Sequence, residues 1–256
     1  MNIQAYSQGK KPNRNEDSWK NNRNTIVVAD GATDKSGKLY GGKTGGEIIS
    51  KLLVDKCIEN DLTGIDLVES LTQTVAELYK KTNPTALIDP HYLFSSTLVY
   101  VRVTGSKLLI TQIGDTSFRI NGKKAFHNST LLDKLTSNAR VDYIKSTNDV
   151  DGGRDFIMPI LKEQTKYQNN PDHILGYGCI DGTEVPSKFI KQFEFSTGEV
   201  ETLEIFTDGY YAVPDGTDIA DWEEIYKTIE TIDPQKYLKY PSTKPSDDRT
   251  IVVAEF

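Results

Sequence analysis

Cysteine, histidine and long apolar runs are all scarce in this sequence of 256 residues. Its two cysteines, Cys57 and Cys179, are too few for a disulfide framework or for a zinc site built from thiolates. Its three histidines lie far apart, without the spacing of histidine-centred metalloenzymes. No apolar run approaches the ~18 residues of a membrane-spanning helix, and the first residues lack the apolar core of a signal peptide. We therefore expect a cytoplasmic protein.

An excess of positive charge is also missing. The chain has 30 Lys and Arg residues against 37 Asp and Glu residues, which gives a formal net charge of −7. Nucleic-acid-binding proteins carry a basic stripe and peripheral membrane proteins a polybasic patch, so we expect neither partner. Hydrophobic residues make up 37% of the chain, enough for a sizeable core. Because no linker divides the sequence, we expect one domain over residues 1–256.

The elements that the sequence predicts are mostly strands. Residues rich in β-branched and aromatic side chains, separated by turn signals, predict strands over 25–29, 96–103, 107–113, 116–120, 123–126, 202–207 and 250–254. Apolar residues at helical spacing predict helices over 47–58, 66–79 and 218–231, the second capped by Asp66. Strands and helices are segregated along the chain rather than alternating, which favours an α+β layered sandwich over a doubly wound parallel sheet.

Several aspartates fall at the ends of the predicted strands. Asp30, Asp115 and Asp208 each follow an apolar strand and sit beside a glycine, and Asp247 comes just before the final strand. In an antiparallel sheet the end of one strand lies beside the beginning of its neighbour. We therefore expect these four carboxylates to share one edge of the sheets.

A fifth carboxylate follows from the register of a predicted hairpin. Residues 15–20 and 25–29 flank the polar turn 21–24. Folding about that turn brings Asp17 within about two residues of Asp30 across the ladder.

Such a cluster of carboxylates points to a metal site. Like charges a few ångströms apart raise each other's pKa unless a cation compensates them, and carboxylate and carbonyl oxygens suit Mg²⁺ or Mn²⁺. Two such ions can activate a water for attack on a phosphoryl group. A single Asp-Gly after a strand is ordinarily a turn, however, and we expect other aspartates to be plain surface residues: Asp34, Asp55, Asp151, Asp181 and Asp215.

The ordered set of motifs resembles the PP2C family of metal-dependent Ser/Thr protein phosphatases over nearly the whole chain. The motifs that carry the resemblance are Asn15-Glu16-Asp17, Val28-Ala29-Asp30-Gly31, Ser95-Ser96-Thr97, Ile113-Gly114-Asp115-Thr116, Phe206-Thr207-Asp208-Gly209 and Asp247-Asp248-Arg249-Thr250. The resemblance implies a four-layer αββα sandwich with two central antiparallel sheets. It also implies hydrolysis of phosphoserine or phosphothreonine by metal-activated water, without a phosphoenzyme.

The resemblance also implies roles for individual residues. Asp30 matches the carboxylate that bridges two Mn²⁺ or Mg²⁺ ions, and Gly31 the carbonyl ligand of the second ion. Asp208 and Asp247 match the ligands of the first ion. Asp17 matches the carboxylate that holds or orients the reacting water. Asp115 matches the position of a weaker third metal in bacterial-type members.

The sequence departs from the family pattern at several positions. Pro12 stands at the ungapped position of the phosphate-binding arginine, so Arg14 and Lys11 become the candidates for that role. Ala32 stands where some eukaryotic members place a general-acid histidine. The substrate-bordering flap of the family should lie within 133–190, where the sequence predicts little.

Two other functions remain open. The missing arginine is compatible with a weak or inactive pseudophosphatase that binds a phosphoprotein or regulates a kinase. A two-metal enzyme acting on another phosphate ester or a nucleic acid is the third reading, although the net charge of −7 counts against nucleic acid. For the phosphatase, we expect a phosphoprotein substrate, an opposing Ser/Thr kinase and a monomeric state.

Overall fold

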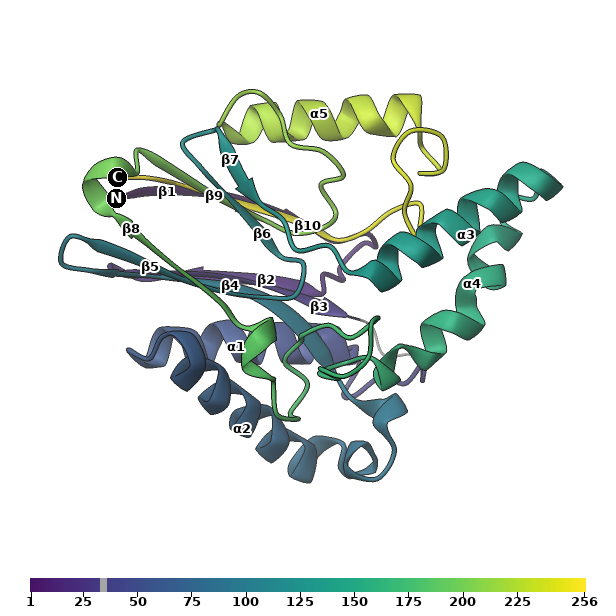
Figure 1. Cartoon of the computed structure of the whole chain (residues 1–256), viewed down its shortest axis with the longest axis horizontal. Helices are drawn as coiled ribbons and strands as arrows, with labels where there is room; N and C mark the ends of the chain where they lie inside the picture. Colours follow the sequence, from purple (N-terminus) through teal and green to yellow (C-terminus); the bar gives the residue numbers. More distant parts are fainter. Residues whose placement is uncertain (33–35) are drawn as a thin grey trace.

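Two antiparallel sheets lie face to face at the centre of the molecule (Figure 1). The structure, a computed structural model, describes residues 1–32 and 36–256. The strands of the first sheet are, in spatial order, β1 (Asn2–Gln8), β10 (Arg249–Glu255), β9 (Thr202–Phe206), β6 (Ser117–Ile120) and β7 (Lys124–Phe126). Those of the second are β2 (Asp17–Asn21), β3 (Thr25–Ala32), β4 (Ser95–Thr104), β5 (Lys107–Ile113) and β8 (Lys191–Ser196).

Helices cover the outer face of each sheet. The antiparallel pair α1 (Gly45–Glu59) and α2 (Gly64–Thr82) lies below the second sheet in Figure 1, and α5 (Ile219–Ile232) lies above the first. The layers are therefore helix, sheet, sheet and helix, which confirms the predicted αββα sandwich. Both chain termini lie together at one end of the sheets, where β1 pairs with β10.

Alternating side chains on the strands feed three apolar cores between these four layers. On β3, Val27 and Ala29 pack toward the helices, whereas Ile26 and Val28 pack between the two sheets. On β10, Val252 faces the other sheet, whereas neighbouring residues join the core beneath α5. Because side chains alternate along a strand, one apolar run supplies two cores at once. This explains why the central strands are continuously hydrophobic.

The predicted helices are present, with one boundary corrected. The first helix begins at a capping box in which the Thr44 side chain accepts from the backbone of Glu47. The second begins at Gly64 after Thr63, so Asp66 lies in the first turn and not at the cap. The Gly64 N–H donates to the Thr111 hydroxyl (2.8 Å), and this tertiary contact starts the helix earlier than the sequence pattern predicts.

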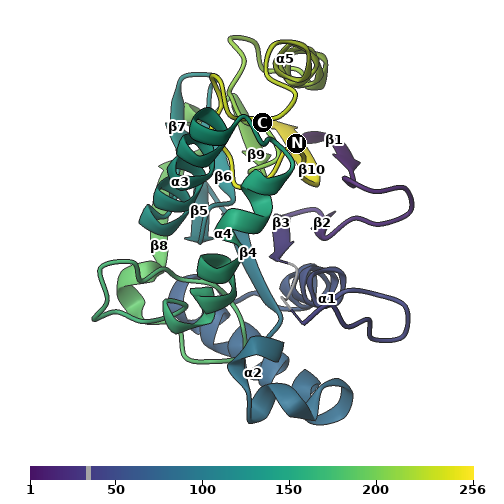
Figure 2. The same cartoon turned by 90° about the vertical axis from the view of Figure 1, so that its right-hand side faces the viewer.

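A helical hairpin that the sequence did not predict lies across the strand ends. It consists of α3 (Leu131–Thr147) and α4 (Gly152–Lys162), which stand in front of the sheets in Figure 2. α4 lies within the segment 133–190 where we expect the flap, and α3 begins two residues before it. The role of the flap stays a prediction, as does the single-domain organisation. Short 3₁₀ turns complete the chain: Pro84–Leu87, Pro90–Tyr92, Glu163–Lys166, Ser187–Phe189 and Thr197–Glu199.

One expected surface aspartate is buried. Asp181 is only 1% exposed, because its carboxylate accepts from the Thr183 backbone (2.8 Å) and from the Asn169 amide (3.1 Å). Asp151 and Asp215 are exposed as predicted, Asp55 is half-buried, and Asp34 lies outside the described residues. Within the described ranges, none of the helices has the length and apolar character needed to cross a lipid bilayer.

Candidate functional site

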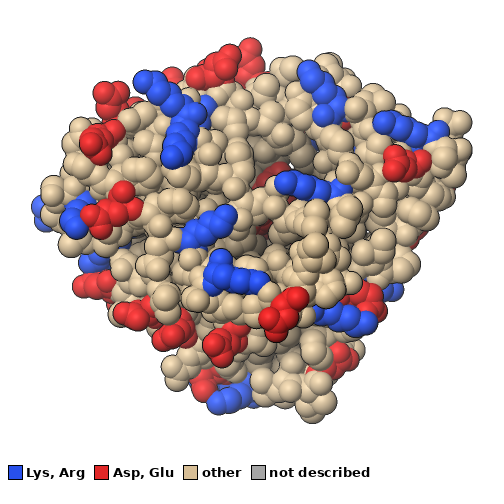
Figure 3. Space-filling view, in the orientation of Figure 1, with Lys and Arg blue, Asp and Glu red and all other residues tan. Residues whose placement is uncertain are grey.

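A cavity of about 440 Å³ opens at the end of the two sheets. Four of the residues predicted for the metal site line it: Asp30, Gly31, Asp115 and Asp208. Figure 3 shows acidic side chains at the bottom of a hollow on one face of the molecule. The strand-end carboxylates therefore share one edge, as the sequence predicts.

Asp17 and Asp30 face each other directly. They are paired residues in the antiparallel ladder of β2 and β3, which agrees with the expected separation of at most about two residues. One Asp17 oxygen, Oδ2, accepts from the Thr207 hydroxyl (2.8 Å), whereas the other, Oδ1, is buried without a hydrogen-bond partner. Burial and repulsion from Asp247 and Asp248 raise the pKa of Asp17 to about 7. A cation bound nearby would favour the charged form of this carboxyl.

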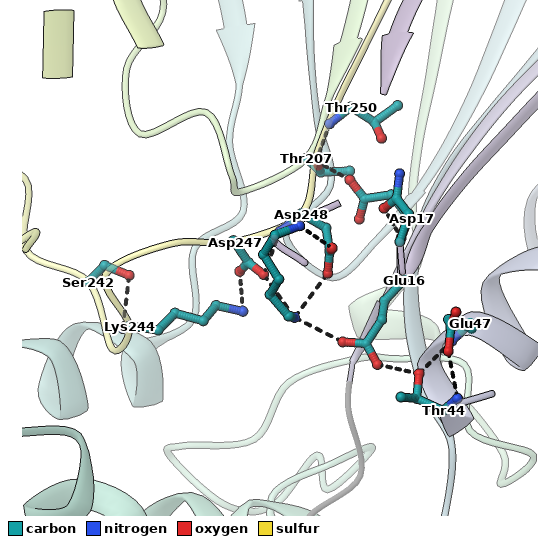
Figure 4. A network of polar contacts seen from close by, with 12 residues as sticks. Glu16, Asp17, Thr44, Glu47, Thr207, Ser242, Lys244, Asp247, Asp248 and Thr250 are labelled. Carbon is teal, nitrogen blue, oxygen red and sulfur yellow. Dashed lines mark hydrogen bonds and ion pairs between the residues drawn. The ribbon is translucent and has the colours of Figure 1, made fainter. Parts of the chain in front are cut away.

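Thr207 joins the two sheets at this edge. Besides donating to Asp17, its hydroxyl accepts from the Thr250 backbone N–H (2.9 Å), and its own N–H donates to the Thr250 carbonyl (3.1 Å). Figure 4 shows Thr207 between Asp17 and Thr250, joined to each by a hydrogen bond. The contact fixes the orientation of the Asp17 carboxylate relative to the strand that follows Asp247.

Gly31 sits where the backbone leaves no room for a side chain. Its N–H donates to the Glu16 carbonyl (3.1 Å). A Cβ at this position would lie 2.3 Å from the Gly46 carbonyl oxygen and 2.6 Å from that of Glu16. The glycine therefore lets the end of β3 pass against the start of α1.

Asp30, Asp115 and Asp208 lie close to other carboxylates; Asp30 and Asp115 are half-buried, and Asp208 is exposed where it lines the cavity. Burial, followed by repulsion from Asp17 and Asp208, raises the pKa of Asp30 well above its usual range. Partial loss of hydration within the cavity, followed by repulsion from Asp247, does the same to the pKa of Asp208. The pKa of Asp115 is raised to about 6 by burial and by the neighbouring Asp133.

Asp247 has different surroundings, because two lysines contact its carboxylate. The Lys244 ammonium pairs with Oδ2, and the Lys10 ammonium lies 3.4 Å from Oδ1. Burial raises the pKa of this carboxyl, but the two ammonium groups outweigh it and hold the pKa below its ordinary value. Figure 4 shows Lys244 reaching Asp247 from the loop that contains Ser242.

Lys10 also binds two carboxylates that the sequence analysis did not assign to the site. Its ammonium lies 2.9 Å from Glu16 and 2.9 Å from Asp248, and Glu16 accepts in addition from the Thr44 hydroxyl (2.6 Å). Both acidic residues were visible within the quoted motifs. The two lysines carry no motif, so only the three-dimensional structure reveals them.

The two residues predicted to bind phosphate lie beside the main cavity and not on its wall. Lys11 is exposed and Arg14 half-buried, and the backbone N–H of Arg14 donates to the Lys11 carbonyl (3.2 Å) in a turn. Both line a smaller cavity of about 160 Å³, which shares Lys10 and Glu16 with the main one. Their phosphate role stays a prediction. Arg154 of α4, which was not predicted, does line the main cavity.

The donor chemistry of the site fits a hard divalent cation. The oxygens come from carboxylates, Asp17 Oδ1 is buried without a hydrogen-bond partner, and the pKa values of four carboxyls are raised by desolvation and mutual repulsion. Across residues 1–32 and 36–256, however, no three Asp, Glu, His or Cys side chains are arranged to hold an ion. The described carboxylates offer suitable oxygens, but no three of them are arranged around a common ion position.

Comparison with known proteins identifies the family. A family model described as protein phosphatase 2C matches residues 6–239. No curated protein matches the chain. Among solved structures, the chain resembles the serine/threonine phosphatase PstP/Ppp of Mycobacterium tuberculosis (15% identity, TM-score 0.52, covering 100% of this chain and 98% of that one). It also resembles Stp1 of Staphylococcus aureus (16% identity, TM-score 0.55, covering 99% and 94%).

A third similar structure is the catalytic domain of PstP in complex with two manganese ions (15% identity, TM-score 0.51, covering 99% of this chain and 97% of that one). At these identities the likeness shows the fold, whereas the family match covers most of the sequence. The chain belongs to the protein phosphatase 2C family.

Proposed function

We propose that this protein is a metal-dependent phosphatase that hydrolyses phosphoserine and phosphothreonine in proteins. The observation that carries the proposal is the direct pairing of Asp17 with Asp30. The carboxylates of Asp115, Asp208 and Asp247 lie at the same edge of the sheets, close enough to affect the pKa values of this pair. Membership of the protein phosphatase 2C family supports the reaction class.

The metal would be Mn²⁺ or Mg²⁺, in two positions. Asp30 would contact both ions. Gly31 would complete one position, and Asp208 and Asp247 the other. A third, weaker ion would use Asp115. When bound, such ions lower the pKa of a coordinated water and neutralise phosphate oxygens. The manganese complex of the similar PstP domain supports this choice of metal.

The protein's own groups would position the reactants. Asp17 is held by Thr207 through one oxygen, so its partnerless oxygen is free to accept a hydrogen bond from the reacting water and to orient it. Arg14 and Lys11 would bind the substrate phosphate from the adjoining cavity. The main cavity, which residues of α4 line, would admit a phosphorylated side chain.

Hydrolysis of a phosphothreonine peptide tests this proposal. We expect turnover with Mn²⁺, loss of turnover with excess EDTA, and a decrease of at least about a hundredfold in Asp30→Asn and Asp208→Asn. Asp215→Asn, which changes an exposed aspartate, is the matched control and should retain full activity. Equal turnover in the two site variants and the control would contradict the assignment.

A second candidate function is a pseudophosphatase that binds phosphoproteins or regulates a kinase. It is favoured by the two lysines on Asp247, which already neutralise one carboxylate of the ligand set. Calorimetric titration separates the two functions. Mn²⁺ binding with turnover identifies the enzyme, whereas binding of a phosphopeptide without its hydrolysis identifies the pseudophosphatase.

We also propose that the protein acts as a cytoplasmic monomer on phosphoproteins made by an opposing Ser/Thr kinase. The proposal includes no nucleic-acid or membrane partner, because a net charge of −7 disfavours binding to these negatively charged surfaces.

A further inference from the structure

Lys244 points into the candidate metal site instead of into solvent. Its side chain is 30% exposed and lines the main cavity, where the ammonium pairs with Asp247. Asp247 itself is 6% exposed and does not line that cavity. The lysine therefore stands between this carboxylate and the space where a cation would enter.

The second lysine occupies the other oxygen of the same carboxylate. Lys10 lies 3.4 Å from Asp247 Oδ1 and is anchored further by Glu16 and Asp248, each at 2.9 Å. Three carboxylates hold Lys10, whereas Lys244 has a single ion-pair partner among the described residues. Fewer ion pairs therefore hold the Lys244 ammonium in place than hold the Lys10 ammonium.

The loop that carries Lys244 is tied to the helical hairpin. The Arg154 guanidinium of α4 donates to the Thr243 carbonyl (2.8 Å), and that of Arg140 in α3 donates to the Ser242 carbonyl (3.1 Å). Movement of Lys244 away from Asp247 would therefore be transmitted to α3 and α4.

We propose that the Lys244 ammonium is an exchangeable counter-ion of the metal-free protein, which leaves Asp247 when a divalent cation binds and thereby lowers the metal affinity of the site. Two cations cannot share one oxygen of Asp247 without strong repulsion, so metal binding includes the cost of displacing the lysine. The inference rests on the proposed metal centre and adds to it a residue that sets metal affinity.

Calorimetric titration of the whole protein with Mn²⁺ tests this inference. Lys244→Met removes the competing charge but keeps an unbranched side chain, so we expect its Mn²⁺ dissociation constant to fall at least about tenfold. Lys244→Arg, which keeps the charge, should bind as weakly as the unsubstituted protein. Lys239→Met removes an exposed lysine of the same C-terminal segment, 5.6 Å from the Tyr240 ring centroid, and should leave the affinity unchanged.

A second measurement needs no substitution. Amine acetylation followed by peptide mass spectrometry reports how accessible each lysine is in the unsubstituted protein. We expect Mn²⁺ to increase the modification rate of Lys244 several-fold, while that of Lys239 stays constant.

The outcomes separate this inference from the proposed function. If Mn²⁺ binds but neither the Lys244→Met affinity nor the Lys244 labelling changes, the counter-ion role is overturned and the metal-dependent phosphatase stands. If Mn²⁺ binds neither the unsubstituted protein nor Lys244→Met, the metal centre is overturned and the counter-ion role with it.

Discussion

Asp17 and Asp247 are buried carboxylates of the same cluster, yet their neighbours give them opposite properties. Asp17 has a hydroxyl on one oxygen and nothing on the other, and its pKa is raised to about 7 chiefly by burial. Asp247 has an ammonium group near each oxygen, and its pKa is lowered despite its burial. Different neighbours therefore shift the pKa values of these two carboxyls in opposite directions, and the two lysines beside Asp247 lie outside the sequence motifs.

Asp233 offers a test of hydrogen bonding away from the site. Its fully buried carboxylate accepts four backbone N–H groups at 2.8–3.0 Å, those of Tyr237, Leu238, Lys239 and Tyr240. Burial raises the pKa of this carboxyl, but the four donors outweigh it and the pKa is lowered. The carboxylate therefore stabilises the fold above its unfolded pKa of ~3.9, and this contribution is lost as the pH falls through the folded value.

We expect Asp233→Asn to lower the stability at pH 7 by about 2 kcal/mol, because the amide replaces a charged acceptor with a donor group. The melting temperatures of the variant and the parent protein should converge as the pH is lowered below ~4. Thermal denaturation monitored by circular dichroism measures both. A melting temperature equal to that of the parent at pH 7 would contradict the assigned role, whereas Asp215→Asn should show that equality.

The buried pair of Arg119 and Glu204 predicts a non-additive pair of substitutions. Arg119 binds both oxygens of Glu204, with Nη2 at 2.7 Å from Oε1, and also donates to the carbonyls of Pro214 and Gly216 (2.6 Å each). Arg119→Met leaves a buried carboxylate without its partner, so we expect a loss of about 3–5 kcal/mol in urea denaturation.

The double variant Arg119→Met with Glu204→Leu should lose less than the sum of the two single variants, because no buried charge is left unpaired. Lys80→Met, which breaks an exposed pair with Glu77, should change the stability by less than about 1 kcal/mol. Strict additivity of the two buried substitutions would show that Arg119 and Glu204 are not energetically coupled.

Among the elements, the junction of β3 with α1 depends on Gly31. Gly31→Ala would place its Cβ against two backbone carbonyl oxygens that cannot rotate away. We expect a loss of about 1–3 kcal/mol in urea denaturation and a weaker affinity for Mn²⁺ in calorimetry. Gly198→Ala is the control, because the nearest atom to its Cβ is Ser196 Oγ at 3.8 Å. Similar behaviour of the two variants would contradict the close-approach explanation.

The central strands and the pairing of Asp17 with Asp30 could be predicted from the sequence because local signals determine them. A polar turn over 21–24 sets the hairpin, and apolar runs identify the strands that are buried on both faces. The outer strands β1 and β8 lack such runs. The first alternates polar with small or apolar residues, and the second alternates Phe193 and Phe195 with polar residues, so neither was predicted.

The α3–α4 hairpin could not be predicted for a different physical reason. The buried face of α3 includes Thr136, Ser137 and Arg140, so it has no continuous apolar stripe at helical spacing. Arg140 is buried because it donates to three backbone carbonyls of residues 235–242, a tertiary contact without a local signal. Lys244 could not be predicted for the same reason, because its position depends on a loop whose carbonyls accept hydrogen bonds from Arg140 and Arg154.

At the scale of the whole molecule, the candidate site lies at one edge of the two sheets, where several acidic residues gather. Thr207, next to the first sheet, donates to Asp17 of the second, so the candidate site draws residues from both halves of the sandwich. Part of the net charge of −7 is concentrated there, and bound cations would neutralise it. A metal ion that binds residues of both sheets should stabilise the entire fold.

Metal addition and removal therefore have a predicted effect on global stability. A ligand that binds only the folded state stabilises it by about 2.7 kcal/mol at a hundred times its dissociation constant. We expect saturating Mn²⁺ to raise the melting temperature by several degrees in differential scanning calorimetry, and EDTA to reverse the shift. In Asp30→Asn the shift should disappear. A melting temperature that does not respond to Mn²⁺ would contradict metal binding by the folded protein.

The central claim, that the strand-end carboxylates form a metal centre, is tested most directly by anomalous diffraction from a crystal soaked in Mn²⁺. We predict manganese peaks beside Asp30 and between Asp208 and Asp247, with the Lys244 ammonium withdrawn from Asp247. The absence of anomalous density at these carboxylates, with Lys244 still paired to Asp247, would contradict the account.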